Sequence, residues 1–170
     1  LISSYSFLSI NKILNNIFQN NKIDSLVQIG ANDGVRFDSL NEFINKYKIN
    51  CLLVEPIKSN FDKLRKKYKN LEFIKLENSA ISINNEISFL YKVNSKYLSY
   101  YDDHIPGITS FDKKHLLKHG VKRNHIIIEK INSMTIKELS EKHKIRHIDL
   151  FYVDAEGYDY DITLQLIDNE

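Results

Sequence analysis

A glycine-bracketed loop, Gly30-Ala31-Asn32-Asp33-Gly34, directly follows the apolar run Val27-Gln28-Ile29 and leads into an amphipathic segment. Glycines let a backbone approach a ligand closely, and free N–H groups at the start of a helix attract polar or anionic groups. Two segments that carry carboxylates end other apolar runs, namely Glu55-Pro56 and Asp154-Ala155-Glu156-Gly157. These residue types predict a site for a nucleotide-sized ligand, with carboxylates that can bind hydroxyl groups or accept a proton.

Glu55 stands about 20 residues beyond the loop, a spacing at which a carboxylate accepts both hydroxyl hydrogens of a ribose. The alternative is an ordinary surface carboxylate at a strand end. A dinucleotide loop has a central glycine that lets the pyrophosphate touch the backbone, and Asn32 occupies that position here. The loop therefore favours S-adenosylmethionine, which has no pyrophosphate, over NAD.

The composition is that of one globular domain rather than of a membrane or nucleic-acid-binding protein. The 170 residues are 42% hydrophobic and carry a formal net charge of +2, so no clustered basic footprint marks a nucleic-acid partner. No apolar run approaches the roughly 18 residues of a membrane helix. The basic run around Lys63–Lys69 is typical of a solvated helix face. Cys51 is the only cysteine, which excludes an internal disulfide and is consistent with a cytoplasmic protein.

The first half of the chain alternates segments with helical and strand patterns, which predicts a parallel sheet covered by helices in an α/β fold. Helices are expected at 5–20, at 35–47 and from a cap at Ser59, and strands at 25–30, 51–54 and 71–76.

The second half predicts a strand at 86–93, a polar loop at 94–110, a short helix at 111–119, a strand at 125–130 and a last strand at 148–153. Within this loop, which is rich in tyrosine and aspartate, the segment Tyr97–His104 has the composition of a loop that closes over a sugar-like acceptor. The alternative is a mobile surface loop. Thr135 and Glu138 have the spacing of a capping box, so a helix should begin there.

The carboxyl ends of parallel strands meet at one edge of the sheet, so the Gly30 loop, Glu55 and Asp154 should lie together. Asp154 is the first choice of general base and Glu156 the second. Alternatively, Glu156 organises the turn before Gly157 and Asp154 only positions substrate. These two carboxylates are too few for a metal site, and His115 with His119 lacks a third ligand, so no metal is expected.

Four segments, in this order along the chain, carry a resemblance that covers most of residues 25–168. They are Val27–Gly34, Val54-Glu55-Pro56, Asn78-Ser79-Ala80-Ile81-Ser82 and Asp149–Asp159, with Gly107–Asp112 ahead of the last two strands as a further match. Together they resemble the FkbM-type S-adenosylmethionine-dependent methyltransferases.

The resemblance implies a class I methyltransferase fold, which is Rossmann-like, and O-methylation of a hydroxyl on a carbohydrate or related metabolite. It places the cofactor's methionine end on the glycine loop, its ribose at Glu55 beside Pro56, and its adenine near Ser79 and Ala80. The loop residues so implied are Gly30, Asn32, Asp33 and Gly34. Asp154 and Glu156 would face the methyl group and the acceptor. Gln28 stands where the family usually has an acidic residue, so a carboxylate contact to the cofactor's ammonium would be lost.

We expect a single domain over residues 1–170, with an N-terminal amphipathic helix within 1–20 and a Rossmann-like core over 25–170. The core is expected to lack its C-terminal strands, which would expose a sheet edge and permit an oligomer. Two alternatives to a methyltransferase remain open: a NAD-binding oxidoreductase and a non-catalytic, truncated cofactor-fold domain that serves as an interaction module.

Overall fold

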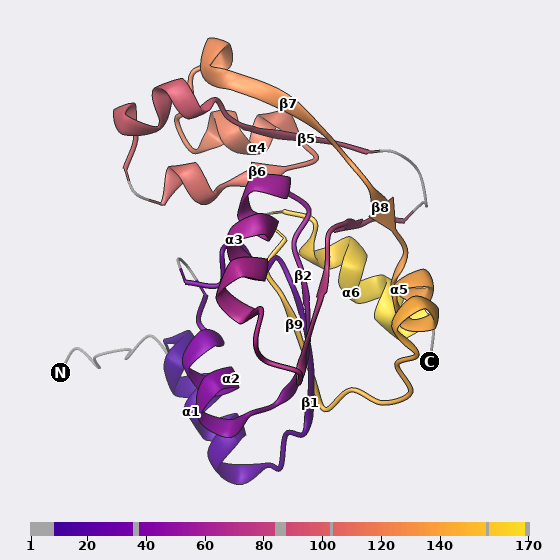
Figure 1. Ribbon diagram of the computed structural model, residues 1–170. Coiled ribbons are helices and arrows are strands. Elements are labelled where there is room, and N and C mark those ends of the chain that lie inside the picture. Colours follow the sequence, from indigo (N-terminus) through magenta and orange to yellow (C-terminus); the bar gives the residue numbers. More distant parts are fainter. Residues whose placement is uncertain (1–8, 36–37, 84–87, 103, 156, 169–170) are drawn as a thin grey trace, which may run out of the picture.

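The computed structural model describes residues 9–35, 38–83, 88–102, 104–155 and 157–168 (Figure 1). Its main sheet has four strands in the order β3-β2-β1-β9, and every neighbouring pair is parallel. The strands are β1 (Ser25–Ile29), β2 (Asn50–Val54), β3 (Ile74–Glu77) and β9 (Leu150–Val153). The predicted parallel sheet is therefore confirmed, and β2 and β9 lie on opposite sides of β1.

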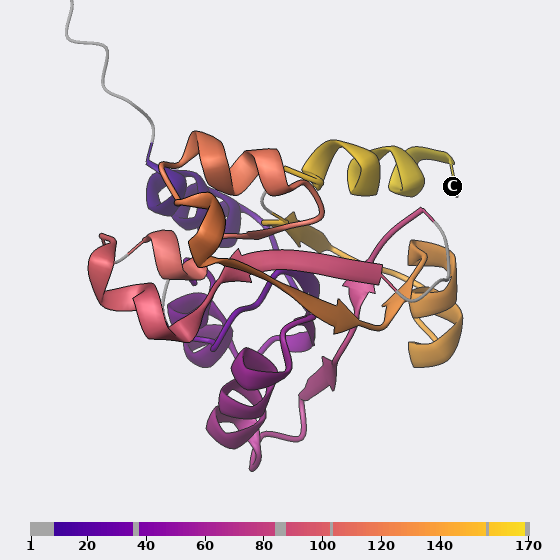
Figure 2. The ribbon, with the colours of Figure 1, turned by 90° about the horizontal axis from the view of Figure 1, so that it is seen from above.

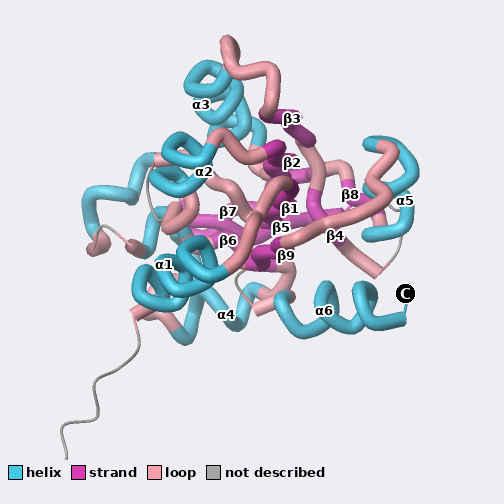
Figure 3. Tube along the Cα trace, turned by 90° about the horizontal axis from the view of Figure 1, so that it is seen from below, coloured by secondary structure: helices cyan, strands magenta, loops and turns pink. Residues whose placement is uncertain are grey.

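Helices cover both faces of this sheet, as the view along the strands shows (Figure 3). One face packs against α1 (Ile10–Asn20), α2 (Asn41–Tyr47) and α3 (Lys58–Tyr68), and the other against α5 (Ile136–His143) and α6 (Asp159–Asp168). Along β1, Leu26 packs in the core on the face of α1, α2 and α3. Val27 and Ile29 pack in the core on the face of α5 and α6. Burial on both faces explains why these strands are nearly continuous apolar runs.

A smaller antiparallel sheet, in the order β6-β5-β7, lies across the carboxyl ends of the main strands (Figures 1 and 2). Its strands are β5 (Ser88–Val93), β6 (Thr109–Ser110) and β7 (Ile126–Ile131). The short parallel pair β4 (Ala80–Ile81) and β8 (Ser133–Met134) lies where the chain passes between the two sheets. The predicted strands at 86–93 and 125–130 thus form a separate layer above the main sheet.

The segment predicted as one polar loop, 94–110, contains short helices instead. They are η1 (Ser95–Tyr100) and η2 (Ile105–Gly107), followed directly by β6. The chain then forms α4 (Lys113–Lys118), as predicted, and η3 (Arg123–His125). Buried Ile105 and Ile108 and partly buried Tyr97 pack in one apolar cluster with Leu116 of α4, which holds this region against the small sheet.

Several predicted boundaries were wrong, and before two of the helices a carboxylate accepts the N–H of the residue two positions further on. α2 begins at Asn41 rather than 35, and the Asp38 carboxylate accepts the N–H of Leu40 just before it. α3 begins at Lys58 after Ile57, so Ser59 is inside the helix and is not its cap. The N–H of Ile57 donates to Glu55 instead. β3 begins at Ile74 rather than 71.

Other local predictions agree with the structure. The capping box of Thr135 and Glu138 is present at the start of α5. The N-terminal helix begins at Ile10 with Ser9 as its cap, and the earlier part of its predicted span lies outside the described residues. Among the described residues β9 pairs with β1 alone, while the absence of further strands and the oligomer remain predictions.

Candidate functional site

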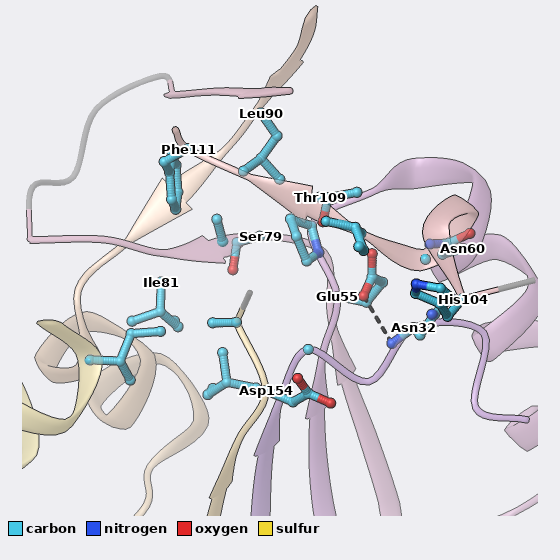
Figure 4. Close-up of a pocket in the computed structure, with 18 of the residues that line it drawn as sticks. Asn32, Glu55, Asn60, Ser79, Ile81, Leu90, His104, Thr109, Phe111 and Asp154 are labelled. Carbon is cyan, nitrogen blue, oxygen red and sulfur yellow. Dashed lines mark hydrogen bonds between the residues drawn. The ribbon is translucent and has the colours of Figure 1, made fainter. Parts of the chain in front are cut away.

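A cavity of about 230 Å³ lies between the carboxyl ends of the main strands and the small sheet above them (Figure 4). Its floor is formed by residues that directly follow β1, β2 and β9, namely Gly30, Glu55 and Asp154. Its cover includes Leu90 of β5 and Thr109 of β6. The three strand ends that the sequence singled out therefore meet at one cavity.

Gly30 has a φ of +85°, a conformation that side chains disfavour. A Cβ atom built there would overlap the carbonyl oxygen of Asp154 and lie 2.9 Å from its carbonyl carbon. The N–H of Gly30 donates to the carbonyl of Val54, and the N–H of Asp154 donates to that of Ile29. A glycine is thus required because the ends of β1 and β9 approach each other here.

Glu55 is buried beneath the loop, with 4% of its surface exposed. One carboxylate oxygen accepts the N–H of Asn32 at 2.9 Å (dashed in Figure 4), and the other accepts the N–H of Ile57 at 2.9 Å. Burial raises the pKa of Glu55 to about 7, although these hydrogen bonds and one from Asn60 favour the ionised form. Glu55 therefore ties the loop to α3, and after these three hydrogen bonds the carboxylate keeps one lone pair for a ligand hydroxyl.

Ser79 and Ala80 line the same cavity from the side of β4. The hydroxyl oxygen of Ser79 is buried without a hydrogen-bond partner among the described residues, and 1% of the residue is exposed. A buried polar atom without a partner costs about 1–3 kcal/mol, so a ligand that pairs with it is favoured. The Asn78 amide donates to the carbonyls of Glu55 and Pro56, which fixes this segment beside the end of β2.

Asp154 is exposed and points toward the cavity from the end of β9 (Figure 4). The turn that follows is held by Asp159, whose carboxylate accepts the N–H groups of Ala155 and Gly157 at 2.8 and 3.1 Å. Glu156, the second candidate base, lies outside the described residues. The contacts that organise this turn therefore come from Asp159, a residue that the sequence reasoning did not single out.

Two residues of the predicted loop set lie away from this cavity. Asp33 lines a neighbouring cavity, and its carboxylate accepts the N–H of Val35 at 3.0 Å. Gly34 packs on α3, where an added Cβ would meet Leu64 at 2.8 Å. Asn32, by contrast, lines both cavities.

Gln28 lies beneath the loop with 1% of its surface exposed. Its amide nitrogen donates to Asp38 at 3.2 Å, while its amide oxygen has no partner among the described residues. Burial raises the pKa of Asp38. The carboxylate nearest to position 28 is therefore that of Asp38, which contacts the Gln28 side chain.

The sequence reasoning missed several cavity residues that come from outside the main sheet. These are Asn60, Leu90, His119 and Ile162, whereas His104 lies in the segment expected to close over the acceptor, and Ile108, Thr109 and Phe111 lie in Gly107–Asp112. The Gly107–Asp112 segment was noted only through the family resemblance. Periodicity could not find the rest, because they reach the site through tertiary packing: Asn60 comes from α3, Leu90 from β5 and Ile162 from α6.

His115 and His119 have ring centroids 4.8 Å apart, but only His119 lines the cavity. Within the described part of the chain, no three histidine, cysteine or carboxylate side chains gather as a metal site would require. The described helices also include none with the length and apolar character to cross a bilayer.

Residues 28–164 match the family model described as the methyltransferase FkbM domain. The match begins at Gln28 in β1 and runs into α6, so it includes all three strand ends that form the cavity floor. No curated protein and no solved structure shows significant similarity to the chain.

Proposed function

The chain belongs to the methyltransferase FkbM family, and from this premise we propose that it is an S-adenosylmethionine-dependent O-methyltransferase. We take its fold as class I and its acceptor as a hydroxyl of a carbohydrate or related metabolite. Family membership favours methyl transfer over hydride transfer with NAD. Asn32 in place of a central loop glycine supports the same choice.

The cavity at the ends of β1, β2 and β9 is the observation that carries this proposal. It combines a glycine loop, a buried carboxylate and a buried hydroxyl on its floor and side. Glu55 would accept a ribose hydroxyl through the lone pair that Asn32, Ile57 and Asn60 leave available. Ser79, whose oxygen lacks a partner in the described structure, would pair with a nitrogen of the adenine.

The apolar cover suits a purine ring. Ile81, Leu90 and Phe111 line the cavity near Ser79 (Figure 4), and Phe111 is braced by Tyr158 with ring centroids 4.7 Å apart. The planar ring of Phe111 can stack on a purine, and the aliphatic Ile81 and Leu90 help to exclude water from it. The residues present therefore fit the cofactor's adenosine half.

When bound, S-adenosylmethionine supplies an electrophilic methyl group on a sulfonium, so the chain needs no nucleophile of its own. The protein must hold the acceptor oxygen in line with the methyl–sulfur bond and remove the hydroxyl proton. Asp154 is the proposed base, because it is exposed at the cavity floor beside the loop. The proton would move from the acceptor hydroxyl to a carboxylate oxygen of Asp154.

Calorimetric titration of the full chain with S-adenosylhomocysteine tests the cofactor assignment. We expect binding in the micromolar range and a loss of about 100-fold in Glu55→Ala, since a charge-assisted hydrogen bond is worth about 1.5–3 kcal/mol. Glu72→Ala removes an exposed glutamate outside both cavities and serves as the matched control. No binding at millimolar concentration would overturn the proposal.

A non-catalytic cofactor-fold module is the second candidate, and transfer of a tritiated methyl group separates it from an enzyme. We expect incorporation into at least one member of a panel of sugars with free hydroxyls. Cofactor binding without transfer to any acceptor would favour the interaction module.

A further inference from the structure

A second cavity, of about 220 Å³, adjoins the first on the side of α3. Four residues line both cavities, namely Asn32, Asn60, Gly107 and Thr109. A molecule in the second cavity would therefore lie against the same groups as a ligand in the first. This continuity is what an acceptor site beside a cofactor site requires.

The second cavity has a different chemistry from the first. Its described lining carries three hydroxyls, two amides, two lysines and one carboxylate over an aliphatic wall, and no aromatic ring. The polar members are Asn32, Asp33, Ser59, Asn60, Lys63, Lys92, Ser95 and Thr109. A lining of this kind suits a polyhydroxylated ligand better than a purine, which would need a flat apolar surface.

The two lysines approach from different elements. Ser59 and Lys63 lie one turn apart on α3 and so share a helix face, whereas Lys92 comes from β5. Lys92 forms an ion pair with Glu129, which offsets its charge. Lys63 forms no ion pair with any described residue, so its charge is available to a ligand.

We propose that this second cavity binds the distal part of a sugar-like acceptor, which bears an anionic oxygen group, a carboxylate, sulfate or phosphate, beside Lys63. The reacting hydroxyl of the acceptor would extend into the first cavity, which Asp154 lines. This inference rests on the proposed function, because it assigns the acceptor of the same methyl transfer. Ser59 would donate a further hydrogen bond to the anionic group. Asp33, the one acid in the described lining, would accept from acceptor hydroxyls.

Amide chemical shifts of the ¹⁵N-labelled full chain test the cofactor site and the acceptor subsite separately. S-adenosylhomocysteine should shift the amides of Gly30 and Ala80 in the first cavity. With that ligand bound, glucuronate, glucose 6-sulfate and glucose 6-phosphate are added in separate titrations at constant ionic strength, with glucose as the neutral probe. At least one anionic sugar should shift the amides of Ser59 and Ser95 and bind at least about fivefold tighter than glucose.

Lys63→Gln should weaken that anionic sugar about fivefold and leave glucose unchanged. Lys66→Gln, an exposed lysine of the same helix outside the cavity, is the matched control and should bind like the parent. The three anionic probes distinguish carboxylate, sulfate and phosphate acceptors from one another.

Each failure has its own meaning. Shifts with S-adenosylhomocysteine but none with any anionic sugar would overturn this inference alone. Equal affinity for glucose and the anionic sugars, or unchanged binding in Lys63→Gln, would overturn it too. No shift with S-adenosylhomocysteine would overturn the proposed function, whatever the sugars do.

Discussion

Glu55 and Asp154 are carboxylates at the ends of strands that flank β1, yet their surroundings differ sharply. Glu55 is 4% exposed, accepts two backbone N–H groups and has a pKa raised to about 7 by burial. Asp154 is exposed on the cavity floor, and its turn is held by the carboxylate of Asp159. The side chain of Glu55 is thus held by hydrogen bonds within the fold, whereas Asp154 is exposed at the cavity.

Under the proposed function, this difference assigns ligand binding to Glu55 and proton transfer to Asp154. A carboxylate fixed by two backbone donors can position a ligand hydroxyl accurately, because its own orientation is set before binding. An exposed carboxylate at the cavity floor can accept a proton from an acceptor hydroxyl. If these roles are correct, substitution of Asp154 should lower turnover, and substitution of Glu55 should weaken ligand binding.

Asp154→Asn should have the largest effect and should act on turnover alone. If Asp154 is the base, kcat should fall by about 10²–10⁴-fold, the usual loss when a general base is removed. The dissociation constant for S-adenosylhomocysteine should stay within about twofold. Asp102→Asn, an exposed aspartate outside both cavities, is the control. A loss of ligand binding as large as the loss of turnover would end the proposed division of roles.

Gly30→Ala should lower the free energy of unfolding by about 3 kcal/mol or more, because strain at positive φ adds to a clash with backbone. The added Cβ would overlap the Asp154 carbonyl, and that carbonyl is fixed by the pairing of β1 with β9. Urea unfolding measures the change.

Gly120→Ala is the matched control for Gly30→Ala. Gly120 has a φ of +82°, but an added Cβ there meets nothing within 4 Å. Only the backbone strain of about 1–2 kcal/mol should appear. If both variants lose the same free energy of unfolding, the close approach of the two strand ends does not contribute to the cost of Gly30→Ala.

The affinity for S-adenosylhomocysteine should rise about tenfold per pH unit up to about pH 7 and then level off. The pKa of Glu55 lies at about 7 in the empty protein, so at lower pH a proton must leave before a ribose hydroxyl can donate to the carboxylate. Calorimetry between pH 5.5 and 8.5 measures this slope. Glu55→Gln should bind weakly and without the slope, and a parent profile that is flat below pH 7 would refute the ribose role.

The same raised pKa has a second consequence for the protein without ligand. A carboxyl whose pKa rises from 4.5 to about 7 on folding stabilises the folded state fully below pH 4.5, and this contribution is lost as the pH rises through 7. Comparing urea unfolding of the parent and Glu55→Gln at pH 5 and pH 8 isolates this contribution from other titrating groups.

Gly157→Ala should have the smallest effect, about 1–2 kcal/mol on unfolding. Its φ is +95°, but the nearest atom to an added Cβ is the His115 ring nitrogen at 3.2 Å, on a side chain that can move. Thermal unfolding checks the value. A loss as large as that of Gly30→Ala would mean that the turn after β9 is as constrained as the loop after β1.

The strand ends were predictable because their signals are local. Apolar runs that stop at Gly30, Glu55 or Asp154 report both the strand and the polar residue at its end. The capping box at Thr135 is equally local, since its two residues stand three apart. Parallel strands then bring their carboxyl ends to one edge of the sheet, so these residues meet whatever the details of packing.

The starts of two helices were not predictable in this way. Ser59 has the residue type of a helix cap, but the cap is Ile57, two residues earlier, whose N–H donates to the carboxylate of Glu55. Asp38 similarly accepts the N–H of Leu40 just before α2. Glu55 is buried and Asp38 is partly buried, so the orientation of both carboxylates depends on packing in the folded protein.

The residues of the sequence thus specified a parallel sheet, a glycine-bracketed loop and two carboxylates at the edge of the sheet. Burial of one carboxylate and exposure of the other were decided by folding, because both depend on which elements cover each strand end. The small sheet and η2 close the first cavity, and α3 with β5 forms the second. These contacts join segments far apart in the chain, where no periodicity or spacing can report them.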